Sequence, residues 1–416
     1  MPTLTSRERI LTAINHKETD KVPIDLGSTY ATGISAIAYH NLKKYLGMKK
    51  GHTRIYDIIQ QLAQPEDEIL DYFKVDVIHL GRFFNDNDDD WYDIEINGIP
   101  AQFPSWFLPR HNQDGSIDVI HPDGTIISRK TKSALVFDQM YWHCFDKYSE
   151  NINNFLQGLP KNHNYVLSTS PFDKLVQNGF WRNLRSKTIE YKSKTDRALV
   201  VNSGLGIFEF GTSMRRMDKF LIDLIRRPNE VEKFLDLIME INLTMLSLIC
   251  KYLGDIVDVI SIGDDLGENS GPFMNPNIYR KIFKPRQASM CEYIKKHSKM
   301  KIFIHSCGSI VPFISDFIEI GIDILNPVQI NAKGMEPKFL KKEFGDDITF
   351  WGGGADTRNV INRKSPAEVK KHVTELLDIF SPGGGFVWST VHNILPDVPP
   401  ENIVAMVEAI HEYNEK

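Results

Sequence analysis

Short runs of apolar and β-branched residues recur along the chain, and they end in Gly, Asn, Asp or His. Each run has about the length of a β-strand and is apolar nearly throughout. Such strands are typical of a parallel sheet that is covered on both faces. The chain contains eight of these runs, which are Val22–Leu26, Val75–Leu80, Ala198–Asn202, Val257–Ile262, Lys301–His305, Ile322–Leu325, Ile348–Trp351 and Phe386–Ser389.

Amphipathic segments separate most of the runs from the third onward. Their apolar residues return at three- and four-residue spacing, which is the pattern of one helix face. Alternating strands and helices predict an α/β fold. Eight strands favour a (β/α)8 TIM barrel over an open doubly wound sheet, and we expect one barrel domain over residues 1–416. The expected helices are Met217–Arg226, Pro228–Leu253, Ile278–His297, Ile310–Ile320 and Ser365–Phe380.

One long stretch, residues 82–197, interrupts this alternation between the second and third strands. It is rich in Asn, Asp and aromatic residues, and it contains two hairpin signals, Asp114-Gly115 and Asp123-Gly124. We interpret it as an inserted β-rich cap over one end of the barrel. The alternative is a surface insertion without a role, although long ordered insertions are more often functional.

The composition and net charge of the chain exclude several classes of protein. The chain has 416 residues, of which 42% are hydrophobic and 25% charged, and its formal net charge is −5. A weakly acidic chain without a basic block is a poor binder of nucleic acid. No apolar stretch approaches the roughly 20 residues that span a bilayer, and the N-terminus has no signal-peptide core. The four cysteines form no CxxC pair, so we expect reduced thiols and a cytoplasmic protein.

Metal-capable side chains occur where the expected strands end, which is where (β/α)8 enzymes carry their chemistry. His305 and Cys307 are two residues apart, and side chains at that spacing on an extended chain point to the same side. His392 follows the eighth strand. Two imidazoles and a thiolate with one open position form a catalytic zinc arrangement. The alternative is that His305 caps its strand and Cys307 is a small buried residue.

Carboxylates form a second group of candidates. Asp264, Asp265 and Glu268 follow the fourth strand, and they are suited to orienting a ligand or to acid–base work. Neighbouring side chains on a strand point in opposite directions, so we expect only one of the two aspartates to face the site. The alternative is a solvated or helix-capping aspartate. Asp25 and Asp356 are weaker candidates of the same kind.

Several motifs together resemble the uroporphyrinogen decarboxylase superfamily, which includes that decarboxylase and the zinc-dependent, corrinoid-linked methyltransferases. The resemblance implies a (β/α)8 barrel, in agreement with the strand count. It is carried by Ser6–Ala13 with Lys21-Val22-Pro23, by Gly263–Pro272, by Ile302–Gly308, and by the tail Leu395–Ile403.

The two branches of this superfamily differ in the residues that they need. The decarboxylase branch implies N-terminal arginines and an Asp near the end of an early strand. Here the matching stretches are Pro23–Tyr30, without arginine, and His79-Leu80-Gly81-Arg82, without Asp. The methyltransferase branch implies His-x-Cys followed downstream by Cys. His305-Ser306-Cys307 matches the first part, and His392 stands in place of the downstream Cys.

The resemblance therefore implies a zinc-dependent methyltransferase that works with a separate corrinoid protein. The cobalamin is expected to arrive on that partner, because the chain has no Asp-x-His-x-x-Gly run. The substrate is expected to be a small methoxy, methylamine or methylthio compound, and a homodimer is possible. Asp264, Asp265 or Gln329 would orient this substrate, and Asp25, Glu268 and Asp356 are further candidates for binding it. Arg82 would pair with a carboxylate of the substrate. Phe83, with Phe84, Trp91 and Trp106, would cover its methyl group or belong to the core of the cap.

Two other functions stay open at this point. The first is a decarboxylase or lyase that uses carboxylates without metal. The second is a non-catalytic barrel that binds a methylated ligand or docks on the corrinoid protein. Bound metal with an open position favours the methyltransferase, and metal-free turnover of a carboxylated substrate favours the lyase. Binding of a ligand without turnover favours the non-catalytic barrel.

Overall fold

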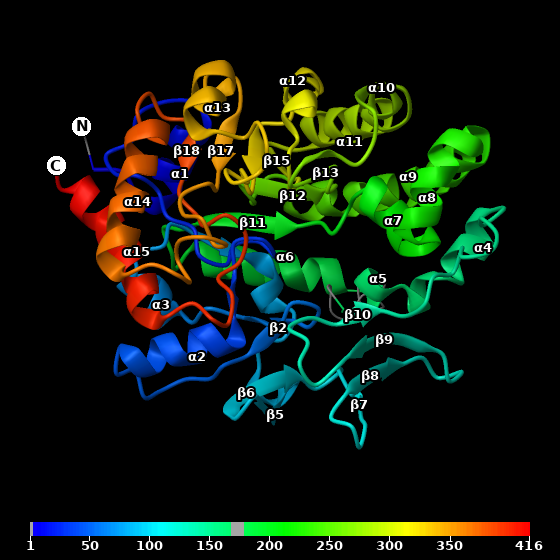
Figure 1. The fold of residues 1–416 in the computed structure, drawn as a ribbon, viewed down its shortest axis with the longest axis horizontal. Helices are drawn as coiled ribbons and strands as arrows, with labels where there is room; N and C mark the ends of the chain where they lie inside the picture. Colours follow the sequence, from blue (N-terminus) through cyan, green and yellow to red (C-terminus); the bar gives the residue numbers. More distant parts are fainter. Residues whose placement is uncertain (1–2, 168–178) are drawn as a thin grey trace.

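The computed structural model describes residues 3–167 and 179–416 and is built around a curled parallel sheet of seven strands. The strand order is β18-β17-β16-β15-β12-β11-β4, so strands that are consecutive in this α/β core are neighbours in space (Figure 1). Seven of the eight expected strands are confirmed. They are β4 (Val77–His79), β11 (Ala198–Asn202), β12 (Val259–Gly263), β15 (Lys301–His305), β16 (Ile324–Asn326), β17 (Thr349–Trp351) and β18 (Phe386–Val387).

The expected first strand, Val22–Leu26, contributes a single bridge instead of a strand. Ile24 pairs in parallel with Trp388, and its carbonyl oxygen accepts the N–H of Asp76 at 2.9 Å. The segment therefore contacts both edges of the sheet. It does not form a regular ladder, because Pro23 has no N–H to donate and the N–H of Ile24 donates to the Asp76 carboxylate.

Helices cover the outer face of the sheet, and the expected segments coincide with them closely. Capping boxes fix the starts of two helices, Thr5 with Glu8 and Ser365 with Glu368. From β11 onward the helices are α7 (Phe208–Arg215), α8 (Met217–Arg226), α9 (Pro228–Leu253), α10 (Pro276–Ile278), a π-helix (Tyr279–Phe283), α11 (Lys284–His297), α12 (Val311–Glu319), α13 (Pro337–Phe344), α14 (Pro366–Phe380) and α15 (Pro400–Asn414).

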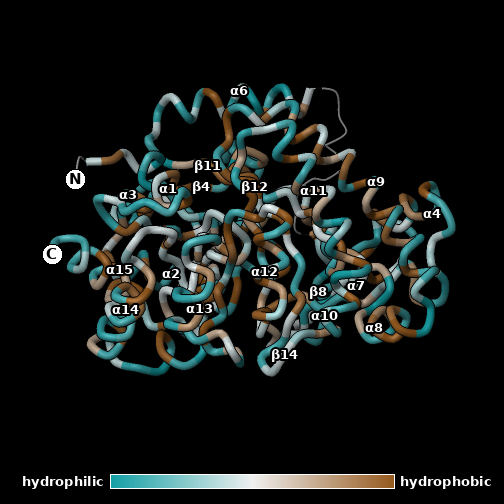
Figure 2. The backbone as a smooth tube through the Cα atoms, turned by 90° about the horizontal axis from the view of Figure 1, so that it is seen from above, coloured by the Kyte–Doolittle hydropathy of each residue, from teal (hydrophilic) through white to brown (hydrophobic). Residues whose placement is uncertain are grey.

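Two apolar cores result from this arrangement. One lies between the strands and the helices, and the other fills the inside of the curled sheet. Phe303, Trp351 and Val387 point into the inner core, and Ile10 and Ile14 of helix α1 (Ser6–Ile14) pack against them. The hydrophobic strands β11 and β12 accordingly lie in the centre of the molecule, with hydrophilic loops around it (Figure 2).

Antiparallel sheets precede and interrupt the parallel one. The N-terminal segment forms β1 (Ile34–Ser35), α2 (Ala36–Tyr45), β2 (Ile55–Asp57), β3 (Leu62–Ala63) and α3 (Asp67–Tyr72). The expected insertion lies between the neighbouring strands β4 and β11, and its residues 168–178 are outside the described part of the chain. Its first half is β-rich, and both Asp-Gly signals form hairpin turns with left-handed glycines. Its elements are β5 (Trp91–Ile96), β6 (Ile99–Pro104), β7 (Arg110–His111), β8 (Ile117–Ile120), β9 (Ile126–Lys130), β10 (Asp138–Gln139), α4 (Ile152–Leu156), α5 (His163–Leu167) and α6 (Phe180–Lys192).

Candidate metal centre

The register of the parallel sheet brings three polar strand ends side by side. Gly263 at the end of β12 is paired with His305 at the end of β15, and His305 is paired with Asn326 at the end of β16. The carboxyl ends of parallel strands meet at one edge, so the residues that follow them share one region. Asp265 and Cys307 come two residues after the paired positions.

His305 is held in one orientation and one tautomer by its neighbour. The Asn326 side-chain nitrogen donates to the carbonyl oxygen of Trp351 at 2.8 Å, which turns the amide oxygen toward His305. That oxygen accepts the Nδ1–H of His305 at 2.7 Å. The Nε2 lone pair is therefore left as an acceptor or metal ligand, the arrangement that second-sphere partners impose on ligating histidines.

Cys307 presents its thiol to that lone pair. Its Sγ lies 3.4 Å from His305 Nε2, and its backbone N–H donates to Asp265 at 2.8 Å. Burial, together with the carboxylates of Asp265 and Glu209, raises the pKa of the thiol well above its ordinary value. The following turn requires glycine, because Gly308 has a φ of +86° and a Cβ there would lie 2.3 Å from the Gly267 backbone.

His392 lies beside His305, in the loop that follows strand β18. Its backbone is left-handed, with a φ of +66°, in a loop held by the neighbouring Asn393. The Asn393 side chain accepts the N–H of Gly33 at 2.6 Å and donates to the carbonyl of Tyr30 at 2.8 Å. The His392 ring centre lies 5.5 Å from that of His305. Burial, and then the proximity of His305, lowers the pKa of His392 to about 4, so the imidazole is neutral at pH 7.

The three side chains together offer a possible metal site. One ligand atom from each of His305, Cys307 and His392 lies within 4.8 Å of the others, and no other such group of three occurs within residues 3–167 and 179–416. Zinc–nitrogen and zinc–sulfur bonds of about 2.0 and 2.3 Å at a tetrahedral angle imply an N···S separation of about 3.5 Å. The observed 3.4 Å between His305 and Cys307 agrees with this value. The three donors could therefore hold a metal ion, and the spacing of the His305–Cys307 pair suits zinc.

A cavity of about 370 Å³ opens beside these donors, and His305, His392 and Asp265 line it. Two further carboxyl groups in its wall, Asp57 and Glu209, were not expected from the sequence. Burial and the nearby Asp265 carboxylate raise the pKa of Glu209 well above its ordinary value, and burial raises that of Asp57 to about 7. The pattern of strand ends missed both residues, because Glu209 lies in the first turn of α7 and Asp57 in the N-terminal strand β2.

The adjacent aspartates after β12 have different surroundings, in line with the expected alternation. Asp265 lines the cavity. Asp264 is buried away from it and accepts the N–H groups of Ile207, Phe208 and Glu209 at 2.6–3.0 Å, which anchors the start of α7. Its second oxygen accepts from the Gln287 side chain at 2.8 Å. Both carboxylate oxygens of Asp264 thus accept hydrogen bonds that hold the fold.

Other candidate residues brace loops around the site. Gln329 accepts the N–H of Gly308 at 2.9 Å, and Asp356 accepts the N–H groups of Arg358 and Asn359. Asp25 accepts from Ser28 and from the Trp351 indole at 2.7 Å inside the sheet. The last expected carboxylate, Glu268, is exposed and bonded to Ser270.

Arg82 and Phe83, which were expected to contact the substrate, pack against other parts of the chain. Arg82 pairs with Asp67 at 3.1 Å and lies over the Tyr191 ring, and neither Arg82 nor Phe83 lines the cavity. The Phe83 ring packs 5.3 Å from the ring of Tyr191. The insertion instead contributes Asn164 and Tyr165 from α5 to the cavity wall.

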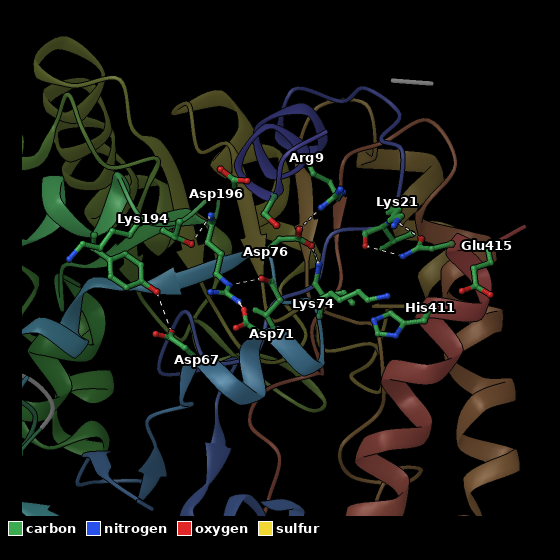
Figure 3. Close-up of a pocket in the computed structure, with 18 residues that line it drawn as sticks. Arg9, Lys21, Asp67, Asp71, Lys74, Asp76, Lys194, Asp196, His411 and Glu415 are labelled. Atoms are coloured by element: carbon green, nitrogen blue, oxygen red, sulfur yellow. Dashed lines mark hydrogen bonds and ion pairs between the residues drawn. The ribbon is translucent and has the colours of Figure 1, made fainter. Parts of the chain in front are cut away.

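A larger hollow of about 670 Å³ lies at the opposite end of the sheet (Figure 3). Arg9 bridges Asp20 at 2.8 Å and Asp76 at 2.5 Å there. Asp76 comes just before β4, so this hollow faces the amino ends of the strands. Residues at that end of such folds serve stability.

Comparison with known proteins shows the family to which the chain belongs. The profile of the family described as Uroporphyrinogen decarboxylase (URO-D) matches residues 192–413, more than half of the chain. The uroporphyrinogen decarboxylase of Pseudoalteromonas translucida (strain TAC 125) is 30% identical over 76 residues, 18% of this chain and 21% of that protein. That of Serratia proteamaculans (strain 568) is 44% identical over 52 residues, 12% of this chain and 15% of that protein. The matches thus span about a fifth or less of these relatives.

A solved structure resembles the chain over nearly its whole length. It is described as a methyltransferase from Methanosarcina mazei, and the alignment covers 99% of each chain with a TM-score of 0.59. At 17% sequence identity, this likeness shows a shared fold. Among the described residues, no helix is both long and apolar enough to cross a bilayer.

Proposed function

The chain belongs to the uroporphyrinogen decarboxylase family, and we propose that it is a zinc-dependent methyltransferase within that family. In this proposal it moves a methyl group between a small methylated compound and a corrinoid carried on a partner protein. The curled sheet, completed through Ile24, would be a (β/α)8 barrel that opens at the site. The observation that carries the proposal is the donor set of His305, Cys307 and His392 beside a cavity.

The chain's own residues suit this role. Zinc bound by the three side chains would supply a Lewis acid for the heteroatom of a methyl donor or for an acceptor thiolate. His305 already directs a lone pair toward Cys307, and His392 is neutral. The Cys307 proton would have to leave on metal binding, because the thiol is protonated at pH 7.

The composition of the cavity wall argues against the decarboxylase reaction. A substrate with many carboxylates needs basic groups, yet none of the described lining residues is Lys or Arg. Such a substrate would instead meet Asp57, Glu209 and Asp265. Like charges that face each other in a desolvated cavity are unfavourable.

Metal content tests the proposal. We would measure zinc by mass spectrometry on untagged protein for the wild type, Cys307→Ala and His392→Ala. Cys250→Ala and His297→Ala are matched controls, since neither residue belongs to the donor group. About one zinc per chain that is lost in both site variants, and kept in both controls, would support the three-ligand site.

The other outcomes are equally informative. Loss of zinc in Cys307→Ala alone would remove His392 from the ligand set. No zinc in the wild type, even after reconstitution, would overturn the proposal. With zinc present, methyl donors are then screened with cob(I)alamin. Metal-free turnover of a carboxylated compound would favour a lyase instead.

A further inference from the structure

The carboxyl groups of the cavity differ from several other buried carboxyl groups of the molecule. Three buried aspartates elsewhere have basic partners and are named at the end of this paragraph, whereas Asp25, Asp264 and Asp356 accept hydrogen bonds from uncharged donors. Asp57, Glu209 and Asp265 have no ion pair with Lys or Arg in the described part of the chain. The paired examples are Asp118 with Arg110 and Arg129, Asp223 with Arg215 and Arg227, and Asp316 with Arg280 and Lys284.

The chain supplies little compensation for these charges from nearby. Asp57 is 1% exposed, and its carboxylate accepts the N–H of Gln60 at 2.8 Å. Asp265 lies 3.4 Å from His305 Nε2, which is a candidate metal ligand. Arg82, the basic residue expected here from the sequence, is paired elsewhere. Burial raises the pKa of Asp57 and of Glu209, which means that their charged forms are unfavourable in the empty cavity, and a bound cation would favour those charged forms.

A metal ion alone does not reverse the sign of the cavity. A divalent ion with one thiolate, that of Cys307, carries a single net positive charge. Asp57, Glu209 and Asp265 share the same cavity, and a cation bound there would favour their ionised forms. The loaded site would still attract a cation and repel an anion.

The uncharged part of the wall favours the same kind of ligand. Aromatic rings of Tyr30, Tyr165 and Phe210 line the cavity, and aromatic faces attract ammonium groups. Asn202 also lines it. Its side-chain nitrogen donates to the carbonyl oxygen of Ser28 at 3.2 Å, whereas its buried side-chain oxygen has no hydrogen-bond partner among the described residues. The wall thus offers a further unused acceptor.

We propose that the cavity selects a small organic cation, a methylated ammonium compound, through Asp57, Glu209 and Asp265. This inference rests on the proposed function, because it takes the cavity beside the donor set as the substrate site. It narrows the expected methoxy, methylamine and methylthio compounds to those that carry a positive charge. A substrate whose recognition depends on a carboxylate is excluded.

Binding of a charged probe and its neutral isostere tests the inference. We would measure choline and 3,3-dimethyl-1-butanol by calorimetry on the full chain, both metal-free and zinc-loaded. The two probes have the same shape and differ in the charge of one atom. We expect choline to bind at least about tenfold more tightly, a modest factor for a desolvated ion pair.

Variants identify the groups responsible. Glu209→Gln and Asp57→Asn are each expected to weaken choline binding several-fold, with little change for the neutral alcohol. Glu292→Gln, at an exposed position on α11, is the matched control and should change neither. Two independent variants keep the test valid if one of them folds poorly. Equal affinity for the two probes, or no choline binding at millimolar concentration, would overturn the inference.

The outcomes separate this inference from the proposed function. Zinc bound by wild type without preference for choline would overturn the inference and leave the metal site intact. Preference for choline in a protein that binds no zinc would overturn the methyltransferase proposal and support a cation-binding cavity. Tighter binding of trimethylacetate, an anion of similar shape, would contradict the charge argument directly.

Discussion

Replacing Asn326 by leucine tests whether the ordering of His305 is what prepares the metal site. Asn326 is fully buried, and its amide oxygen accepts the His305 Nδ1–H at 2.7 Å. Leucine has a similar size but no acceptor, so the ring would lose both its fixed orientation and its fixed tautomer. Loss of such an outer-sphere partner weakens metal binding by roughly 10- to 100-fold, or about 1.4–2.8 kcal/mol.

The assay is competition for zinc against a chromophoric chelator, with circular dichroism to establish that each variant is folded. Asn331→Leu is the matched control, because Asn331 lies in the loop after the same strand and bonds to Asp356. Asn326→Asp keeps an acceptor for His305 and should bind zinc more tightly than Asn326→Leu. A folded Asn326→Leu protein whose zinc affinity changes less than about threefold would refute the reasoning, since one tenfold step is the least expected.

Three further predictions follow from groups outside the donor set. Asp264→Ala leaves three N–H groups at the start of α7 without an acceptor, so the free energy of unfolding measured in urea should fall by about 3 kcal/mol or more. Asp265→Ala removes the acceptor of one N–H group and should lower it by about 1 kcal/mol. Equal losses in the two variants would contradict the structural role of Asp264. The pKa of Asp118 is lowered, chiefly by its hydrogen bonds with Arg129, so its stabilisation is present above the unfolded pKa of about 3.9 and is lost as the pH falls below it. Asp118→Asn should therefore lower the melting temperature at pH 7, and a gap from wild type that fails to narrow below about pH 4 would speak against this. Arg82→Ala should leave choline affinity unchanged, because its guanidinium is paired outside the cavity, and a clear loss in calorimetry would return Arg82 to the site.

Local patterns predicted the parallel sheet well because each element carries its own signal. The periodic segments Met217–Arg226 and Pro228–Leu253 coincide with α8 and α9. The run Lys301–His305 is β15. Val22–Leu26 was wrong as a strand, because Pro23 and the Asp76 carboxylate remove the N–H groups that a ladder needs. An apolar run indicates that a segment is buried, but it does not indicate the hydrogen-bond partners of the backbone.

The site was predicted less evenly. His305, Cys307 and His392 were found, because all three follow strands whose carboxyl ends meet at one edge. Arg82 was predicted to pair with a carboxylate of the substrate, and in the structure it pairs with Asp67 of helix α3, outside the lining of the cavity. Glu209 was missed, since a glutamate in the first turn of a helix is an ordinary feature of helices.

The sequence by itself determined the elements, their order and the residue types at the strand ends, because hydrophobic period and capping residues act over short distances. Only the tertiary structure decided which of those side chains share a cavity. The register of β12, β15 and β16 places Asp265 beside Cys307. The hydrogen bond between Asn393 and Gly33 of the N-terminal segment holds the loop that places His392 beside His305. Partners that lie hundreds of residues apart leave no local pattern. Their convergence is set by packing and by the hydrogen bonds that packing permits.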